Sequence, residues 1–132
     1  MSRSFEELSL GVEHHTYTII GRCRRTGGLG IGIATYSLAV GGYCPFIKTN
    51  VAALSTQAYA NPELGPLAMG LLEADRTPEQ VLEELAGHDR YAEYRQVGIV
   101  DRHGTAAVHT GNETRQWAGH ILGDGFVAMG NG

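Results

Sequence analysis

Residues 29–34 alternate strictly between bulky and nearly bare side chains, which constrains the fold more than any other stretch of the chain. One face would carry Leu29, Ile31 and Ile33, and the other Gly30, Gly32 and Ala34. A period of two is the pattern of a β-strand. A face without bulk lets another layer or a ligand approach the backbone closely. The pattern therefore predicts a strand that is packed on both of its faces.

Two amphipathic helices are expected in the middle of the chain. Apolar residues recur at helical spacing after Pro62, at Leu64, Leu67, Ala68, Leu71 and Leu72. In the second helix, Thr77 is placed as the N-cap, Pro78 occupies the first helical position and Gln80 completes a capping box. Gly87 is placed to end this helix.

The predicted elements follow the order strands, two helices, strands, which indicates an α+β or layered sandwich rather than alternating βαβ units. Two helices can cover only one face of such a sheet. The 19 glycines among 132 residues sit inside apolar runs rather than in a linker. A sheet that is apolar on both faces needs a second cover, so we expect this chain to need a partner surface.

Composition narrows the classes of function. The chain has 132 residues, 42% of them apolar, which fits one globular domain. A net charge of −4 argues against a nucleic-acid partner, and no apolar run approaches the roughly 20 residues that span a bilayer. No signal-peptide core is present in residues 1–10, so the expected location is the cytoplasm. Cys23 and Cys44 match no metal-binding spacing, and a disulfide between them is not expected.

The stretch 54–66 carries hydrogen-bonding side chains without charge at a predicted strand-to-helix junction. Such junctions often carry function because a rigid scaffold aims them. The residues concerned are Ser55, Thr56, Gln57 and Asn61. They predict a pocket for an amide or a similar neutral polar group.

Six histidines are present, and no pair has the helical spacing of a zinc site, so no metal or cofactor is expected. His109 ends a predicted strand, and His120 follows a Trp-Ala-Gly run. Either one could orient a substrate or act as an acid or base. A histidine bonded to a loop carbonyl explains each of them equally well.

A hydroxyl nucleophile is the remaining catalytic option. The serine-hydrolase elbow Gly-x-Ser-x-Gly does not occur. A hydroxyl can instead be activated by its own N-terminal amine, and Thr16 begins the first predicted strand. Residues 1–15 precede it, and unless they are removed its nitrogen is an amide that cannot act as a base. A strand-edge threonine is then the simpler interpretation.

Several segments in matching order resemble one known family, the domain of unknown function 1028. The most specific of them is the Thr-Gln-x-x-Ala-Asn-Pro run at residues 56–62. The resemblance starts near residue 16 and runs to the end of the chain. The other segments that carry it are residues 16–20, 26–34, 38–41, 65–66, 95–101, 109–111, 117–120 and 130–131.

This resemblance implies an Ntn-hydrolase-like fold, a four-layer αββα sandwich over residues 16–132 with residues 1–15 as an extension. It implies a hydrolase-like site at the start of the first strand, although the family's reaction is largely unassigned. Family members begin almost at the threonine that matches Thr16. They often carry Ser-Lys where this chain has Thr35-Tyr36, so a candidate lysine is missing. Members also continue well past the residues that match Gly130 and Asn131.

The resemblance therefore leads us to expect about half of the fold from this chain. The other half would be a companion chain, made either by self-cleavage of a precursor after Gly132 or by a second gene. The nucleophile is then Thr16 or the first residue of the companion chain, with Asn131 and Gly132 beside it. Higher oligomers of such heterodimers are expected.

Three hypotheses for function follow. The first is an amidohydrolase of the N-terminal-nucleophile type that acts on a small amide, cyclic amide or amidine. In it, Gln57 and Asn61 hold the substrate or line an oxyanion hole, and His109 and His120 are secondary polar groups. The second is a non-catalytic ligand-binding or assembly subunit. The third, a histidine-based metal hydrolase, has the least support.

Overall fold

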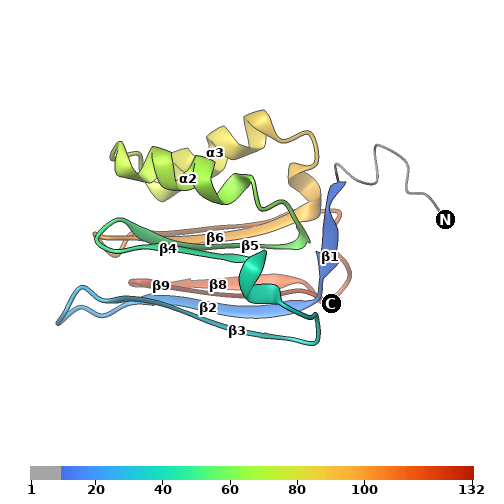
Figure 1. Ribbon diagram of the computed structural model, residues 1–132, viewed down its shortest axis with the longest axis horizontal. Coiled ribbons are helices and arrows are strands. Elements are labelled where there is room, and N and C mark those ends of the chain that lie inside the picture. Colours follow the sequence, from blue (N-terminus) through green and yellow to red (C-terminus); the bar gives the residue numbers. More distant parts are fainter. Residues whose placement is uncertain (1–9) are drawn as a thin grey trace.

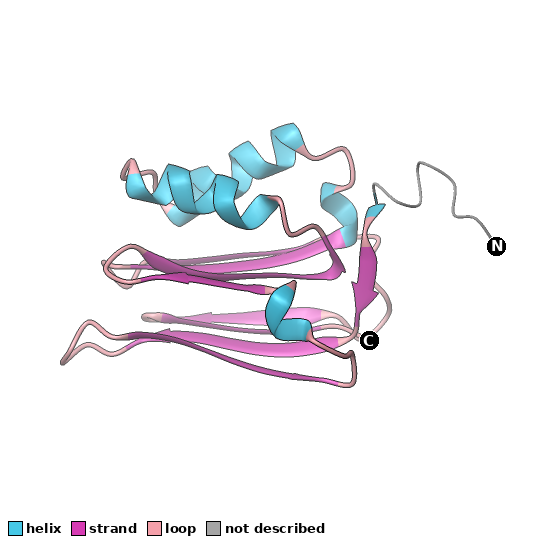
Figure 2. Ribbon diagram, viewed as in Figure 1, coloured by secondary structure: helices cyan, strands magenta, loops and turns pink. Residues whose placement is uncertain are grey.

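The computed structural model describes residues 10–132, which form three layers. A pair of helices lies on one sheet, and a second sheet lies beneath the first (Figure 1). We call the sheet in contact with the helices the inner sheet and the other one the outer sheet. The colouring by secondary structure makes the same order of layers visible (Figure 2).

The inner sheet is antiparallel. Its strands follow the order β1-β5-β6-β7, and β4 also pairs with β5 beyond the end of β1. In the register of the central pair, Gln57 stands opposite Gln96. The strands are β1 (Val12–His14), β4 (Pro45–Lys48), β5 (Ala52–Ala60), β6 (Arg95–Asp101) and β7 (Ala106–Thr110).

The outer sheet is also antiparallel, and its strands follow the order β3-β2-β9-β8. Thr16 stands opposite Thr35 at the end of the β2–β3 pair. Gly130 lies between Tyr17 of β2 and Gly119 of β8 in the register. The strands are β2 (Thr16–Arg22), β3 (Leu29–Thr35), β8 (Gly119–Gly123) and β9 (Phe126–Gly130).

Two α-helices, α2 (Leu64–Glu73) and α3 (Pro78–His88), form the third layer. The capping box predicted for α3 is confirmed, because Thr77 accepts from the Gln80 backbone N–H at 3.2 Å and Gln80 accepts from that of Thr77 at 3.0 Å. Gly87 does not end the helix, which was predicted wrongly; its φ is not positive, and α3 continues to His88. Short 3-10 turns η1 (Val40–Gly42) and η2 (Ala92–Tyr94) complete the elements.

Strands β5 and β6 are buried on both faces, and their side chains feed two separate cores. Ala52 and Leu54 point to the helices, whereas Ala53 between them points to the outer sheet. The core under the helices contains Ala52, Leu54, Leu64, Ala68, Leu72, Val81, Leu85, Val97 and Ile99. The core between the sheets contains Ile20, Ala53, Val100, Val127 and Met129.

The two sheets approach each other closely at Gly98. A Cβ atom there would lie 3.0 Å from Val127 and 3.1 Å from the Met129 sulfur, both on the outer sheet. The missing side chain on β6 therefore lets the layers meet. This is the use predicted for glycines inside apolar strands.

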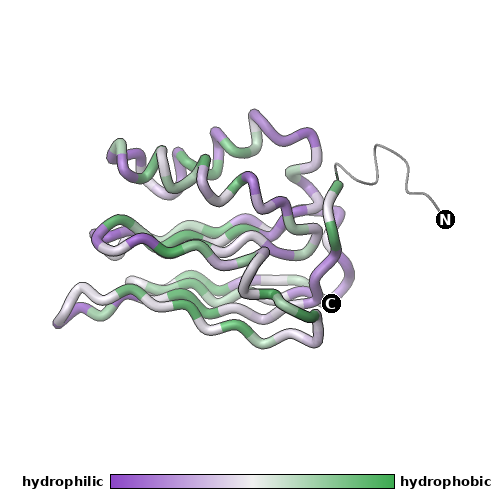
Figure 3. The backbone as a smooth tube through the Cα atoms, in the orientation of Figure 1, coloured by the Kyte–Doolittle hydropathy of each residue, from purple (hydrophilic) through white to green (hydrophobic). Residues whose placement is uncertain are grey.

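The far face of the outer sheet is apolar and exposed. Tyr17 is 69% exposed, Ile19 56% and Ile121 66%. The bare face predicted for β3 belongs to this surface, since Gly30, Gly32 and Ala34 are exposed. Within residues 10–132 β3 is therefore packed on one face, and the prediction of packing on both faces is wrong for the bare one. Figure 3 shows hydrophobic stretches along the strands of both sheets, including this outermost one.

The elements agree with the sequence pattern at the level of a mixed protein with antiparallel sheets and two α-helices. Strands β1, β4 and β8 are elements that the pattern did not predict as such. The two cysteines are free, as expected, with Cys23 exposed and Cys44 buried.

Candidate functional site

A cluster of buried amides lies between the sheets at the end where β2 begins and β9 finishes. Gln57 of β5 and Gln96 of β6 are both 0% exposed. Gln57 donates through Nε2 to Gln96 Oε1 at 2.9 Å, and its own Oε1 accepts from the Thr18 hydroxyl at 2.5 Å. Both side chains extend from the inner sheet toward the outer one. They replace apolar packing by a hydrogen-bonded bridge between the layers.

Gln96 is the centre of this cluster. Its Nε2 donates to the carbonyls of Gly130 at 2.9 Å and Gly119 at 3.0 Å, and to the Thr110 hydroxyl at 3.0 Å. Its Oε1 also accepts from Asn131 Nδ2 at 3.2 Å. One side chain thus fixes the ends of β8 and β9 and the residue that follows them. We call Thr16, Thr18, Gln57, Gln96, Thr110 and Asn131 the amide cluster.

Thr16 lies at the edge of the amide cluster and is 1% exposed. Its carbonyl accepts from Gln57 Nε2 at 3.2 Å and from the Asn131 backbone N–H at 3.1 Å. Its hydroxyl donates to the Thr35 hydroxyl at 3.4 Å, and Thr35 in turn donates to the His15 carbonyl at 2.7 Å. The fold therefore brings together Thr16, Gln57 and Asn131, three of the residues singled out in the sequence.

A pocket of about 370 Å³ opens directly beside Thr16; we call it the terminal pocket. Its wall is more apolar than polar, and its polar side chains are His15, Thr35, Tyr36 and Asn131, so it is suited to a small molecule with few polar atoms. Gly132 lies against the His15 ring, since a Cβ there would come within 2.6 Å of the ring. The lining residues are His15, Tyr17, Ala34, Thr35, Tyr36, Asn131 and Gly132.

The two histidines predicted as secondary polar groups lie in different places. His120 joins the amide cluster, because its Nδ1 lies 2.8 Å from the Thr110 hydroxyl. His109 lies with α3 and β6 on the helix side of the inner sheet, where its Nε2 is 3.0 Å from the Ala92 carbonyl. The structure does not bring His109 to the amide cluster, and this contact matches the loop-carbonyl alternative.

The remaining predicted residues surround Gln57 or lie beyond it. The Ser55 hydroxyl is 3.5 Å from Gln57 Oε1, at the limit of a hydrogen bond. Thr56 points the other way along the strand, and its buried hydroxyl has no hydrogen-bond partner among residues 10–132. Asn61 accepts from the Glu63 backbone N–H at 3.1 Å, which shapes the turn into α2. In this arrangement Asn61 has a local structural contact.

Residues just before Thr16 belong to the inner sheet. Val12, Glu13 and His14 form β1 and pair with β5. Arg95, 1% exposed, binds the Leu10 carbonyl and donates to the Tyr59 carbonyl at 2.8 Å. These contacts hold residues 10–14 against β5 and β6 of the inner sheet, and β2 begins shortly after them.

Burial lowers the pKa of His14, which is 4% exposed and whose ring nitrogens have no hydrogen-bond partner among the described residues. Its ring contacts the Tyr43 ring, with centroids 5.4 Å apart. A neutral imidazole is the form that such a site favours.

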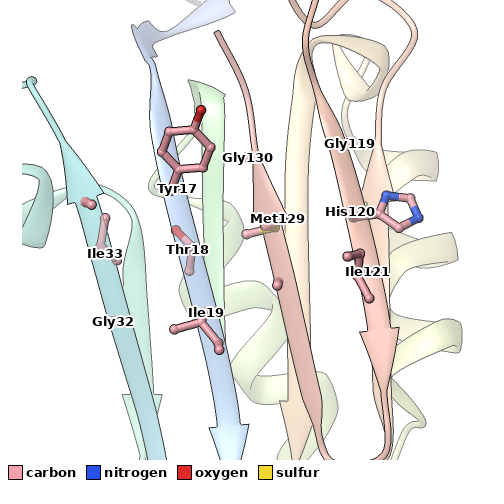
Figure 4. Close-up of a pocket in the computed structure, with 12 residues that line it drawn as sticks. Tyr17, Thr18, Ile19, Gly32, Ile33, Gly119, His120, Ile121, Met129 and Gly130 are labelled. Atoms are coloured by element: carbon pink, nitrogen blue, oxygen red, sulfur yellow. The ribbon is translucent and has the colours of Figure 1, made fainter.

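The exposed face of the outer sheet forms a broad, shallow pocket of about 680 Å³. Figure 4 shows β3, β2, β9 and β8 side by side, with Tyr17 and Ile19 along β2 and Ile121 on β8. The surface is apolar apart from His120 at its edge and the Tyr17 hydroxyl. It is suited to covering by another apolar layer rather than to chemistry.

Sequence reasoning did not single out Gln96, Glu13, His15 or Tyr36. Gln96 could have been noticed, since it is a polar residue at the head of the apolar run 97–100. No pattern could have paired Glu13 with His15 and Tyr36, because that contact depends on how β1 leaves the inner sheet.

Within residues 10–132, no three His, Cys, Asp or Glu side chains gather as the ligands of a metal ion would. The same residues contain no helix with the length and apolar character needed to cross a membrane.

The comparisons with known proteins give one family. The model of the family of unknown function DUF1028 matches residues 16–132. A crystal structure of protein SPO2555 from Silicibacter pomeroyi, described under the same family, is similar with a TM-score of 0.84 and 29% identity. The similarity covers 89% of this chain and 54% of that one, so this chain spans about half the length of SPO2555. No curated protein matches this chain. The chain belongs to the DUF1028 family.

Proposed function

We propose that this protein is a subunit of an N-terminal-nucleophile-type amidohydrolase that acts on a small amide, cyclic amide or amidine. The observation that carries the proposal is the terminal pocket beside Thr16, with the amide cluster behind it. His15, Thr35, Tyr36 and Asn131 line this pocket, and the Thr16 hydroxyl lies behind it, 3.4 Å from the hydroxyl of Thr35. Acyl transfer from an amide requires these groups: a nucleophile, a proton acceptor and donors for the developing oxyanion.

The substrate class follows from the charge of the pocket. Its lining residues include no lysine, arginine, aspartate or glutamate. An anionic substrate would lose its hydration there without gaining a positive counter-charge. Neutral amides lose less on entering such a pocket, and the Tyr36 hydroxyl can exchange hydrogen bonds with them.

The nucleophile has two possible sources in this proposal. The Thr16 nitrogen is a peptide nitrogen bonded to His15 in this chain, so it cannot act as the base for its own hydroxyl. The Thr16 side chain is also 1% exposed. Both facts favour the second source, the first residue of a companion chain that would lie beside Asn131 and Gly132.

The exposed apolar face of the outer sheet supports a companion chain. Water-exposed Tyr17, Ile19 and Ile121 lie on one continuous surface with bare backbone around them. A helical layer from the companion would bury this surface and give the four-layer αββα arrangement of an Ntn hydrolase. The match to about half of SPO2555 is consistent with this role. We place the assembled protein in the cytoplasm, in keeping with its two free cysteines.

A non-catalytic ligand-binding or assembly subunit is the second candidate. The burial of the Thr16 hydroxyl favours it, because a binding subunit needs the terminal pocket but no accessible nucleophile. The two candidates differ in one measurable respect, which is turnover.

The test is release of ammonia or amine from a panel of small primary, cyclic and substituted amides by the purified protein, together with any polypeptide that co-purifies. Thr16→Val replaces the hydroxyl by a methyl group of similar size. Thr105→Val makes the same change in the exposed turn at the opposite end of β7, and serves as the matched control. The equivalent change is made at the first residue of a companion chain, if one is present.

The proposal predicts turnover that one of the two hydroxyl-to-methyl changes abolishes and that Thr105→Val leaves intact. Binding of an amide without any turnover would support the ligand-binding subunit instead. Turnover that survives both changes would exclude a hydroxyl nucleophile.

A further inference from the structure

A carboxylate, an imidazole and a phenol stand in series at the terminal pocket. His15 lies between β1 and β2, and its Nε2 is 3.0 Å from Glu13 Oε1. The other ring nitrogen, Nδ1, is 3.1 Å from the Tyr36 hydroxyl just after β3. The two rings meet edge to face, with centroids 5.5 Å apart. The imidazole therefore joins an acid on one side to a hydroxyl on the other.

The protonation of the three groups follows from Glu13. Burial alone would raise the pKa of Glu13, but hydrogen bonds and charge from Arg115 and His15 outweigh it, and the pKa is lowered from 4.5. Arg115 Nη2 lies 3.1 Å from Glu13 Oε2. An ionised carboxylate can only accept, so the ring proton of His15 is assigned to Nε2. The Nδ1 lone pair then faces the Tyr36 hydroxyl and accepts its proton in the hydrogen bond.

Only one end of this series is open to solvent. Tyr36 is 79% exposed, whereas the side chains of His15 and Glu13 are 24% and 19% exposed. Tyr36 and His15 both line the terminal pocket. A molecule in the pocket therefore reaches the phenol first and the carboxylate last.

We propose that Glu13, His15 and Tyr36 form an acid–base relay in which the Tyr36 hydroxyl exchanges protons with a small neutral carbonyl compound in the terminal pocket. The order of groups is that of a carboxylate–imidazole–hydroxyl triad, with a phenol in the place of the serine. Tyr36 contacts the ligand, His15 is the base behind it, and Glu13 is a positioning residue that fixes the tautomer. Tyr36 stands in this chain where family members often carry the lysine of a Ser-Lys pair.

In the acylation step, the nucleophilic hydroxyl adds to the substrate carbonyl carbon. As the carbon–oxygen bond forms, the proton of that hydroxyl passes to the Tyr36 oxygen and the Tyr36 proton passes to His15 Nδ1. The resulting imidazolium is stabilised by the Glu13 carboxylate. The proton returns through Tyr36 to the leaving nitrogen when the carbon–nitrogen bond breaks. This use of the relay rests on the proposed amidohydrolase function, whereas the relay itself does not.

The relay can be tested without a substrate through the nucleophilicity of Tyr36. An aryl sulfonyl fluoride reacts with a phenol when the oxygen bonds to sulfur, fluoride leaves and a base takes the phenolic proton. His15 supplies that base only to Tyr36. Tyr17 is a matched internal control in the chain without a companion, where it is 69% exposed on the same pocket. Peptide mass spectrometry of the purified full chain measures both labelling rates.

We expect Tyr36 to be labelled about 100-fold faster than Tyr17 at neutral pH, which is the lower end of the range of general-base effects. His15→Gln should lower the Tyr36 rate to that of Tyr17. Glu13→Gln should lower it in part, and Glu13→Asp should restore some of the loss. Controls of the same chemistry on the exposed part of α3, His88→Gln and Glu83→Gln, should leave the ratio unchanged.

The ratio of the two labelling rates in the unmodified protein tests the relay even where a variant fails to fold.

Equal labelling of Tyr36 and Tyr17, or a Tyr36 rate that His15→Gln leaves unchanged, would overturn the relay. Selective labelling of Tyr36 in a protein that turns over no amide would support the relay and reject the proposed function. Amide turnover with unselective labelling would support the proposed function and reject the relay.

Discussion

Replacing Gln96 by methionine should show how much the hydrogen bonds of the amide cluster, as distinct from apolar packing, contribute to the free energy of unfolding. Methionine has nearly the same length and fills the same space, but it makes none of the contacts of the amide. Asn131 Nδ2 and Gln57 Nε2 would lose the acceptor that they share, and the carbonyls of Gly119 and Gly130 would lose a donor. Gln57 keeps its second bond, to the Thr16 carbonyl.

Each buried polar group left without a partner costs about 1–3 kcal/mol. About two groups are affected in full, so we expect Gln96→Met to lower the free energy of unfolding by about 2–6 kcal/mol. Urea denaturation followed by circular dichroism measures the loss, and the m-value should not change. Hydrogen exchange at Gly130 and Asn131 should accelerate more than exchange in α3, because the cluster holds that end of the outer sheet.

The matched control is Gln116→Met, on an exposed loop. It should change stability by less than about 0.5 kcal/mol. If Gln96→Met stays within the same range, the amide cluster does not hold the two sheets together. In that case the amide cluster would not position Thr16 and Asn131 either.

Three further predictions concern other parts of the fold. In the native protein an alkylating reagent should modify Cys23 and spare Cys44, because hydrogen bonds from Thr26 lower the pKa of Cys23 whereas burial raises that of Cys44 to about 12; equal rates by mass spectrometry would contradict this. Asp89→Asn should cost about 3–5 kcal/mol in urea denaturation, since it leaves the Arg95 guanidinium, held by Asp89 at 2.7 Å, buried and unpaired; a loss under 1 kcal/mol on the same scale would refute it. The lowered pKa of His14 means that the unfolded chain binds a proton that the folded chain does not, so its contribution is complete above about pH 6.5 and declines as the pH falls below it; His14→Phe should flatten that part of a stability–pH profile, and an unchanged slope would count against the burial argument.

The sequence was informative about the layers because the apolar pattern encodes them directly. The alternation in β3, the helical stripe of α2 and the capping box of α3 each depend on residues close together in the chain. The end of α3 was less predictable, because a glycine ends a helix only when the backbone takes a positive φ, and Gly87 does not. Strand β8 was hidden for a related reason, since its exposed Ile121 and Leu122 show no clear inward face.

The candidate site was only partly predictable. Thr16, Gln57 and Asn131 were singled out, and the register of β2, β5 and β9 brings them together. Gln96 was missed because a buried amide in an apolar strand has no signature until its partners across the sheets are known. Asn61 and His109 were chosen for their chemistry, but their side chains make local contacts that no composition rule distinguishes from a ligand contact.

No single sequence segment predicts the Glu13–His15–Tyr36 series. Glu13 and His15 are two residues apart, but Tyr36 joins them only because Thr35 stands opposite Thr16 in the β2–β3 pair. A one-residue change of that register would move Tyr36 to the other face. Only the three-dimensional fold therefore brings these three residues together.

Treating the purified protein with a β-lactone and mapping the product by mass spectrometry shows whether an acyl-transfer hydroxyl nucleophile is present at the terminal pocket. Ring opening by a nucleophilic hydroxyl leaves one acyl group on that residue. We predict a single acylated site, on Thr16 or on the first residue of a co-purifying polypeptide. No acylation at either residue, in a preparation that also hydrolyses no amide, would contradict the account.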